Sequence, residues 1–581
     1  MKNVLIKEKI PLLIILFLYV ISYIVSYAHW GDVIIDCGRE VYVPYAISQG
    51  KVLYKDIFCI YGPFPYLFNA FFIKIFPFKL NTYYTIGAIF GLSYIFGVYL
   101  CARNFLSKFV SSAISLLVMY AVVLDIFIFN YILPYSYAIV FASVFSIWIL
   151  YFLINYVKTK NTNYLYYSAI LWGGICTSKI EFIPVIIPIA VLYLLIEKDK
   201  TNVFFKFVGY SLIIPFISYL VLFCQGLTVS DLIKNSKYLG EMLEASSLKY
   251  FYGNFCVSGF NFKVFISNLK NTISLIFTGA IFFVLMFFAL KRKKRVIKYA
   301  LIALISIFYF GILMFQGIHP QIIFSMLPYV CTVIFLIKLL RFIRGKEYKN
   351  TESIITLTLY LFAIVTSLKS YHSLQLGFYG TYSFAPLLIC IILFLNELLE
   401  LEFLYSTKKQ CECAIFTFLM VLVLVFINIF ALQITKEDSY IRTKLGTIKM
   451  EKQNALALGE AISYLSNHSA KDDSLLVLPE GIMINYLTQK KWDFYQTSFI
   501  PLDFDTFGED NIIKDVTNKR PDFIMFIKRD TSEYGKEYIC KDYGIKTCKY
   551  IAKNYSFEGA FGEKFRVFLF KQKDIKQDEE K

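Results

Sequence analysis

Apolar residues occur along this chain in runs of roughly 20, separated by short polar stretches. A run of that length forms a helix long enough to cross the hydrocarbon core of a bilayer. We predict about thirteen crossings, and therefore a polytopic α-helical membrane protein. The runs span residues 10–28, 82–101, 109–127, 134–154, 164–178, 180–196, 204–225, 271–290, 297–316, 320–340, 352–369, 381–398 and 412–433.

Basic residues between the runs indicate the orientation of the chain. With the N-terminus inside, the inner loops hold clusters such as "KRKKRVIK", whereas the short outer loops hold only Lys179 and Lys369. Lys and Arg are enriched in cytoplasmic loops. We therefore expect a cytoplasmic N-terminus, and an odd number of crossings then places the C-terminus outside.

Residues 1–433 form the membrane module. Two longer polar segments lie within it, and a third polar region follows it. Residues 29–81 and 227–270 form two outer loops. Residues 434–572 are predicted to form an extracytoplasmic α/β domain, because "NALALGEAISYL" has helical spacing and "SLLVLP", "DFIMFIK" and "FRVFLF" are β-like runs. Residues 573–581 are predicted to be a disordered tail.

Composition narrows the functional class. Charged residues make up 17% of the chain, against about 25% in soluble proteins. The net charge is +17, but only ten of the 59 basic residues are Arg and many flank apolar runs, so we expect no nucleic-acid partner. The sequence contains no P-loop, dinucleotide-binding fingerprint or Ser-His-Asp pattern.

The twelve cysteines are scattered and lack the paired spacing of a zinc site. Cys540 and Cys548 lie close together in the predicted outer domain. Two cysteines this close can pair if that domain faces an oxidising compartment, and the sequence leaves open whether they form a disulfide.

The first outer loop is unusually rich in charged and aromatic residues. "REVYVPYAIS" and "FPYLFNAFFIKIF" have helical spacing, so the loop should contain two short helices lying along the membrane. Asp36 and Arg39 are three residues apart and would share a helix face. An interfacial amphipathic segment is one interpretation, and an active site near the membrane surface is the other.

Between Asp36 and Pro63, the pattern D-x-G-R-E-x-Y-x-P, then G-K-V-L-Y-K-D, then Y-G-P resembles the first outer loop of GT-C class glycosyltransferases. That class includes protein O-mannosyltransferases and the aminoarabinose transferases that modify lipid A. "FNYILPYSYA" (129–138) and "GGICTSKIEFIP" (173–184) are similar to further segments of these proteins. The resemblance also implies thirteen helices with an outer C-terminal domain.

The resemblance implies an inverting glycosyltransferase of the bacterial plasma membrane. Such an enzyme moves a sugar from a polyprenyl-phosphate donor to a lipid-linked, cell-surface polymer or protein acceptor on the outer face. The catalytic aspartate of the class corresponds to Asp36, with Arg39 close to the donor phosphate. A carboxylate can accept the proton of the incoming hydroxyl, while a cation stabilises the departing phosphate.

One position departs from the class. The members that modify lipid A carry a lysine at the place of Tyr61, so the donor phosphate must be bound elsewhere, by Arg39, Lys179 or Lys369. Ionisable residues at membrane depth are costly and are usually functional. The supporting or acceptor-binding residues are expected to be Glu40, Asp56, Tyr61 and Glu181. No cofactor is required by the sequence, and a divalent metal shared by Asp36 and Asp56 stays open.

Two other functions remain alternatives. A glycan polymerase or ligase of the O-antigen type should concentrate its essential residues in the loop 227–270. A transporter or flippase should show ionisable residues or broken helices in paired halves, and it leaves the large outer domain unexplained. The position of the essential carboxylates distinguishes the three functions: the first outer loop favours the transferase, the loop 227–270 favours the polymerase, and helix interiors favour the transporter.

Overall fold

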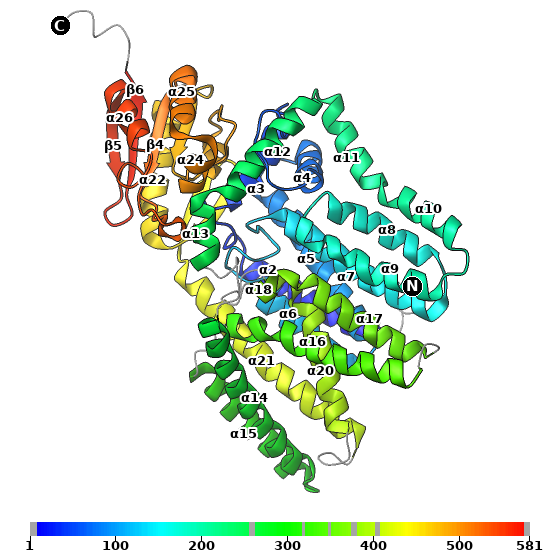
Figure 1. Ribbon diagram of the computed structural model, residues 1–581. Coiled ribbons are helices and arrows are strands. Elements are labelled where there is room, and N and C mark those ends of the chain that lie inside the picture. The colour runs from blue at the N-terminus through cyan, green and yellow to red at the C-terminus, as the bar shows by residue number, and fades with distance from the viewer. Residues whose placement is uncertain are drawn as a thin grey trace, which may run out of the picture.

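The computed structural model describes residues 8–254, 262–315, 320–346, 350–372, 380–400 and 407–573. A helical array makes up most of it, and a smaller domain of strands and helices lies at one end (Figure 1). The predicted fold class is therefore confirmed. Apart from Lys573, the predicted tail lies outside the described residues.

Each predicted crossing coincides with helical structure, and the run 204–225 is divided into two helices near Leu212. The helices are α2 (Lys9–Val25), α5 (Leu80–Ala102), α6 (Lys108–Val118), α7 (Tyr137–Thr159), α8 (Asn163–Cys176), α9 (Ile186–Ile196), α10 (Lys200–Ser211), α11 (Ile213–Cys224), α14 (Phe262–Leu290), α15 (Arg295–Phe315), α16 (Pro320–Arg344), α17 (Thr351–Thr366), α20 (Phe384–Glu400) and α21 (Lys408–Lys436).

The predicted number of thirteen crossings is not confirmed. Within the described residues, eight helical stretches are long and apolar enough to cross a membrane. Helices α2, α8, α9 and α17 have only 17, 14, 11 and 16 residues. At about 1.5 Å per residue they are shorter than the hydrocarbon core of roughly 30 Å. The apolar runs are longer than these helices because they also include adjoining turns and, before α9, the 3₁₀ turn Ile180–Val185.

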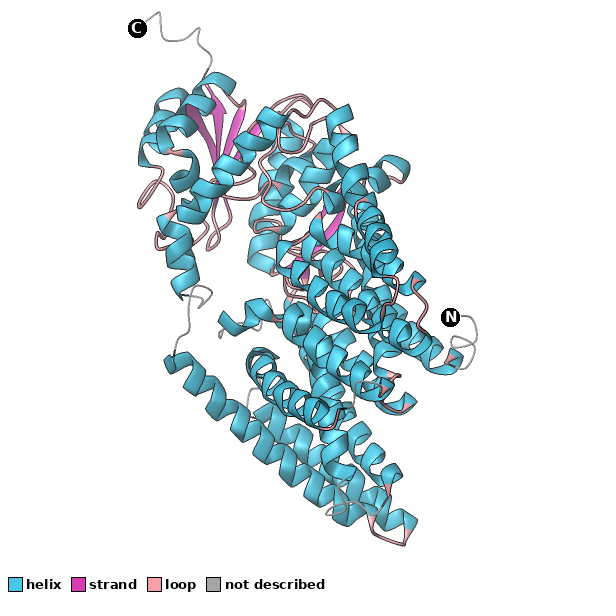
Figure 2. Cartoon of the chain, turned by 45° about the vertical axis from the view of Figure 1, so that its right-hand side comes forward, coloured by secondary structure: helices cyan, strands magenta, loops and turns pink. Residues whose placement is uncertain are grey.

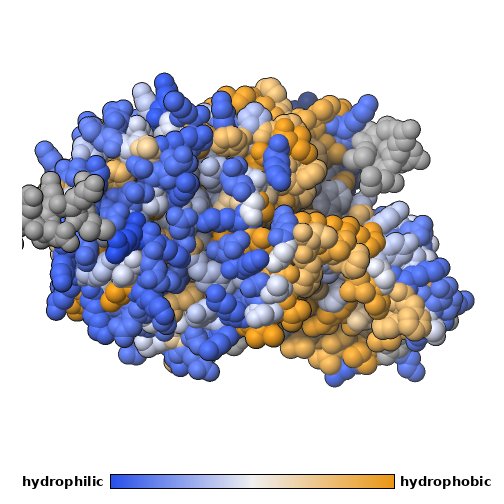
Figure 3. All heavy atoms as spheres, turned by 90° about the horizontal axis from the view of Figure 1, so that it is seen from above, coloured by the Kyte–Doolittle hydropathy of each residue, from blue (hydrophilic) through white to orange (hydrophobic). Residues whose placement is uncertain are grey.

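Large apolar side chains are exposed on the outside of the array. Phe205, Phe216, Phe277 and Phe315, on α10, α11, α14 and α15, are examples. Viewed from above, hydrophobic residues cover one side of the molecule and hydrophilic residues cover the side of the α/β domain (Figure 3). Contiguous apolar surface of this kind needs a non-aqueous surrounding. The chain is therefore a multi-pass membrane protein.

Both long outer loops contain helices. The first contains α3 (Cys37–Ser48) and α4 (Phe64–Ile75), at the two positions where helical spacing predicts them. The second contains α12 (Val229–Glu244) and α13 (Ser246–Asn254). In Figure 1, α12 and α13 run from the end of α11 along the α/β domain.

The C-terminal domain begins with an antiparallel hairpin of β1 (Ser439–Thr443) and β2 (Gly446–Met450). A separate four-stranded sheet follows (Figure 2), with the order β3-β4-β6-β5. Its helices are α22 (Lys452–His468), α23 (Met483–Thr488), α24 (Pro501–Phe507), α25 (Glu509–Lys519) and α26 (Ile545–Asn554), and its strands are β3 (Leu475–Leu478), β4 (Phe523–Ile527), β5 (Tyr555–Phe561) and β6 (Val567–Gln572).

The sheet is mixed, which follows from its connections. Strands β3 and β4 are parallel, with Leu475 opposite Phe523, and α23, α24 and α25 lie in the crossover between them. Strand β6 pairs antiparallel with β4 on one side and with β5 on the other. All four residues of β3 are buried, as expected for an apolar strand covered on both faces.

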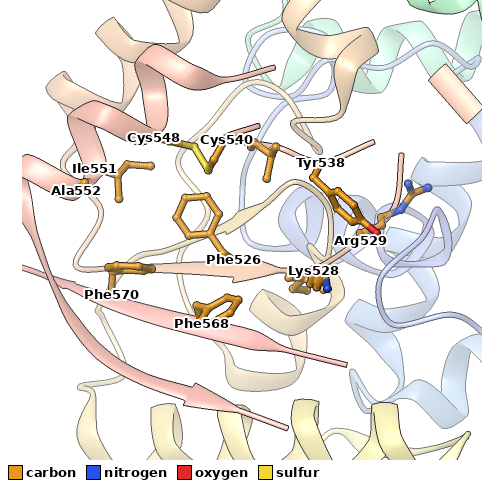
Figure 4. Close-up of a pocket in the computed structure, with 12 residues that line it drawn as sticks. Phe526, Lys528, Arg529, Tyr538, Cys540, Cys548, Ile551, Ala552, Phe568 and Phe570 are labelled. Carbon is orange, nitrogen blue, oxygen red and sulfur yellow. A yellow bond between two sulfur atoms is a disulfide. The ribbon is translucent and has the colours of Figure 1, made fainter. Parts of the chain in front are cut away.

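Cys540 and Cys548 form a disulfide, and the other nine described cysteines are free. The disulfide borders a cavity of about 450 Å³ against the sheet. Figure 4 shows the rings of Phe526, Phe568 and Phe570 lining the other side of this cavity.

The α/β domain is attached directly to the first outer loop. The N–H of Lys449 in β2 donates to the carbonyl of Ala28 over 2.7 Å, and the N–H of Leu80 donates to the carbonyl of Leu445 over 2.8 Å. At the other end of the domain, Phe58 N–H donates to the Tyr495 carbonyl over 2.7 Å. These contacts fix the loop between the membrane helices and the α/β domain.

Candidate active site

Asp36 stands immediately before α3, with φ +44°, a value that residues other than glycine rarely adopt. An aspartate at this position usually caps the first turn with its carboxylate, but Asp36 makes no such side-chain bond. Its Oδ1 lies 3.4 Å from Nη1 of Arg39 instead. The backbone conformation thus directs the carboxylate to Arg39, three residues away, as the spacing predicts.

Arg39 is held by three groups. Besides Asp36, its Nε lies 3.1 Å from Oε1 of Glu40, and its Nη2 donates to the carbonyl of Tyr135 over 2.8 Å. Because Tyr135 precedes α7, the guanidinium joins the first outer loop to the segment that enters α7. The Arg39 side chain is mostly buried, so its positive charge is held in one position.

Glu40 is completely buried and fully bonded. Oε1 accepts a hydrogen bond from Tyr66 Oη over 2.8 Å, and Oε2 accepts one from the N–H of Tyr137 over 2.7 Å. Burial raises the pKa of Glu40, while the charge of Arg39 opposes this shift. With both oxygens bonded inside the protein, Glu40 orients Arg39.

Tyr61 links the first outer loop to Lys179. The Nζ of Lys179 lies 3.9 Å from the centroid of the Tyr61 ring, and the guanidinium carbon of Arg39 lies 5.2 Å from the same centroid. A desolvated cation over an aromatic face is stabilised by the ring quadrupole. At the position of Tyr61, this chain therefore has an aromatic ring that contacts two cations.

Gly62 permits this arrangement. Its N–H donates to the Ser178 carbonyl over 3.1 Å. A Cβ at this position would lie 2.2 Å from the backbone of Thr177, so no larger residue fits without displacing one of the two segments. The close approach carries Tyr61 to Lys179, which follows α8 and precedes the 3₁₀ turn Ile180–Val185.

Glu181 joins the two predicted lysines. Its Oε1 lies 3.0 Å from Nζ of Lys369 and 3.7 Å from Nζ of Lys179. Lys369 lies in the short helix α18 (Leu368–His372), almost 200 residues from Lys179 in sequence. The structure thus brings Asp36, Arg39, Lys179 and Lys369 into one cluster, with Glu40, Tyr61 and Glu181 between them.

Asp56 lies elsewhere. It is exposed, and its Oδ2 accepts a hydrogen bond from the N–H of Val52 over 2.8 Å, closing a local turn. Asp32 likewise bonds locally, to the N–H groups of Ile34 and Ile35. Within the described residues, no group of three or more His, Cys, Asp or Glu is placed to hold a metal ion.

The α/β domain contributes residues that sequence reasoning missed. Oε1 of Glu480 accepts a hydrogen bond from the N–H of Asp36 over 3.2 Å, and its Oε2 lies 3.1 Å from Nε of Arg529. Burial raises the pKa of Glu480 to about 7, although Arg529 opposes the shift. Asp36 and Glu480 are 444 residues apart, and no signal in the sequence indicates that they are in contact.

Residues 61–223 match the sequence profile of the family described as dolichyl-phosphate-mannose-protein mannosyltransferase. This range contains Tyr61, Lys179 and Glu181, and it follows Asp36 and Arg39. The match confirms the resemblance to the GT-C class that the motifs of the first outer loop indicate.

Two solved structures are similar over nearly the whole chain. The first is ArnT from Cupriavidus metallidurans bound to undecaprenyl phosphate, with 11% identity, coverage of 96% of this chain and 97% of that one, and a TM-score of 0.46. The second is the oligosaccharyltransferase AglB from Archaeoglobus fulgidus in complex with an inhibitory peptide and a dolichol-phosphate, with 13% identity, coverage of 98% and 75%, and a TM-score of 0.46. No curated protein matches the chain in sequence.

Proposed function

We propose that this chain is an inverting glycosyltransferase that takes a sugar from a polyprenyl-phosphate donor. The acceptor is a hydroxyl of a lipid-linked, cell-surface polymer or protein on the outer face of a bacterial plasma membrane. One observation carries the proposal: a carboxylate, Asp36, lies 3.4 Å from a buried guanidinium at the start of an interfacial helix. Lys179 and Lys369 lie in the same cluster.

In the proposed reaction, the acceptor oxygen attacks the anomeric carbon from the side opposite the phosphate. Asp36 accepts the hydroxyl proton as the new C–O bond forms. The bond between the anomeric carbon and the phosphate oxygen breaks, and its electron pair leaves with the polyprenyl phosphate. Arg39 and Lys179 stabilise the phosphate charge, since preorganised cations in a water-poor site lower the barrier most where charge develops.

Tyr61 stands where the members that modify lipid A carry a lysine, and its proposed role is to support the cations and not to bind the phosphate itself. The centroid of the ring lies 3.9 Å from Nζ of Lys179 and 5.2 Å from the guanidinium carbon of Arg39. These two cations can bind one phosphate together, so the loop needs no lysine at the position of Tyr61. The buried Glu40 and the shared Glu181 balance these cations. A phosphate entering the cluster would then compete with Glu181 for the lysines.

The loop 227–270 has a different set of contacts. Ser246 Oγ donates to Asp505 over 2.8 Å, and Lys234 lies 4.8 Å from the ring centroid of Tyr495. These contacts connect α12 and α13 to the α/β domain. What favours the transferase over a polymerase is the position of the cluster around Asp36, which is built on the first outer loop.

Binding of undecaprenyl phosphate tests the donor site. We expect the purified protein in nanodiscs to bind it, as detected by native mass spectrometry, and to bind the uncharged undecaprenol much more weakly. Lys179→Met should weaken binding of the phosphate by about tenfold. Lys338→Met is the matched control, because Lys338 pairs with Glu397 over 2.6 Å between α16 and α20. Equal affinity for the phosphate and the alcohol would contradict the proposal.

A further inference from the structure

The backbone of Asp36 is held in place by the C-terminal domain. Asp36 adopts φ +44°, and its N–H donates to Oε1 of Glu480 over 3.2 Å. A strained backbone conformation persists only when surrounding groups hold it. Because the same conformation leaves the Asp36 carboxylate free of helix capping, the bond to Glu480 bears directly on where that carboxylate points.

Glu480 is itself fixed. Its side chain is 12% exposed, and that of Arg529, whose Nε lies 3.1 Å from Oε2, is 9% exposed. Nη2 of Arg529 lies 2.8 Å from Glu533 Oε1. Figure 4 shows the guanidinium at the edge of the aromatic cavity, pointing out of it towards the N-terminal segment of the chain. The Arg529 charge thus fixes the Glu480 carboxylate at the start of α3.

Packing next to this bond is close. A Cβ on Gly38 would lie 2.8 Å from the backbone nitrogen of Met483 and 3.1 Å from the Ile482 side chain. The first turn of α3 therefore lies against the start of α23, three residues beyond Glu480. The Phe58–Tyr495 and Leu80–Leu445 backbone bonds join the domain to the loop at further points.

We propose that Glu480 is a positioning residue for glycosyl transfer: by binding the N–H of Asp36, it holds the catalytic carboxylate in its working orientation. The α/β domain then completes the active centre and is more than a cover over it. Glu480 exchanges no proton or bond with the substrate. The inference rests on the proposed role of Asp36, and the experiment below separates the two.

Three variants of Glu480 test the role at equal membrane abundance. Glu480→Gln keeps an oxygen that can accept the Asp36 N–H, so transfer to the surface glycan should stay within about threefold of wild type. Glu480→Ala removes the acceptor and Glu480→Asp withdraws it, so each should lower transfer by about tenfold or more. The control is Glu558→Ala, which removes a carboxylate bonded to Tyr464 over 2.9 Å elsewhere in the domain.

A second readout separates positioning from folding. The purified Ala and Asp variants should bind undecaprenyl phosphate with wild-type affinity, because the donor cluster is intact. If Glu480→Ala or Glu480→Asp transfers sugar as the wild type does while Asp36→Asn is inactive, the positioning role of Glu480 is overturned and the proposed function stands. Loss of both transfer and undecaprenyl phosphate binding would also overturn it, since that result reports a structural role. Wild-type transfer in Asp36→Asn would overturn the proposed function itself.

Discussion

At the residue scale, the site depends on a few side chains whose polar atoms already form hydrogen bonds or ion pairs within the protein. Glu40 has both oxygens bonded and no exposed surface, so it serves Arg39 and leaves Asp36 as the carboxylate that can meet an acceptor. The sequence motif predicts Asp36 and Arg39, because their three-residue spacing places them together. It does not predict that Tyr61 lies beneath two cations, because Lys179 is more than a hundred positions away.

The ring of Tyr61 should matter more than its hydroxyl. Tyr61→Phe keeps the aromatic face below Lys179 and Arg39, so donor binding should stay near wild type. Tyr61→Leu removes the cation–π contacts and should weaken undecaprenyl phosphate binding by about tenfold. Native mass spectrometry of both purified variants measures this. Equal affinities for the two variants would show that the ring does not hold the cations.

Asp503 should make the stability of the α/β domain depend on pH. Burial raises the pKa of this carboxyl to about 7, while the hydroxyl of Ser498 and the N–H of Ile500 oppose the shift. Because the folded-state pKa lies above the ordinary value, its contribution to stability is complete at low pH and is lost as pH rises through about 7. The wild-type Tm should therefore fall between about pH 4 and pH 7.

Asn cannot ionise, so Asp503→Asn should show a smaller fall in Tm over the same interval. Thermal unfolding of both proteins in the same detergent provides the comparison. Parallel Tm profiles would mean that Asp503 does not titrate in this range.

At the element scale, the helices were the most predictable part of the fold. Each apolar run coincides with helix, and the loop helices α3 and α4 lie where their spacing predicts them. The number of crossings was not predictable, because hydropathy does not show that α8 ends at Cys176 or that a 3₁₀ turn follows Lys179. The contact of Thr177 and Ser178 with Gly62 depends on tertiary packing, which local sequence does not encode.

Gly62 should be intolerant of a side chain. Its Cβ would lie 2.2 Å from the Thr177 backbone, so Gly62→Ala should separate Tyr61 from Lys179 and lower transfer by about tenfold or more. Gly240→Ala in α12 is the control, because nothing lies within 4 Å of its Cβ. Surface-glycan yield at equal abundance measures both. A fully active Gly62→Ala protein would show that the approach of the two segments is not needed.

At the scale of the whole molecule, the membrane array and the α/β domain meet on the first outer loop. The domain reaches the loop through the β1–β2 hairpin, through Tyr495 and through Glu480. Sequence patterns predicted the strands β3, β4 and β6 but not these contacts, since hydropathy says nothing of which surfaces meet. The proposed active centre therefore combines the first outer loop with Glu480 of the α/β domain.

The Cys540–Cys548 disulfide gives a test of orientation. If the domain lies outside the plasma membrane, these two thiols are oxidised in cells, whereas a cytoplasmic domain would keep them reduced. Cells alkylated before lysis should yield a linked Cys540–Cys548 peptide by non-reducing mass spectrometry. Alkylated Cys540 and Cys548 in that sample would contradict the outward orientation.

The most direct test of the central claim is a surface-glycan profile by mass spectrometry. It compares the deletion strain, the strain complemented with wild type, and the strain complemented with Asp36→Asn at equal membrane abundance. We predict that one sugar is absent from the deletion strain and the Asp36→Asn strain and returns with wild type, because a lost catalytic base lowers turnover by orders of magnitude. A wild-type profile from Asp36→Asn would contradict the assignment of Asp36 and the transferase mechanism built on it.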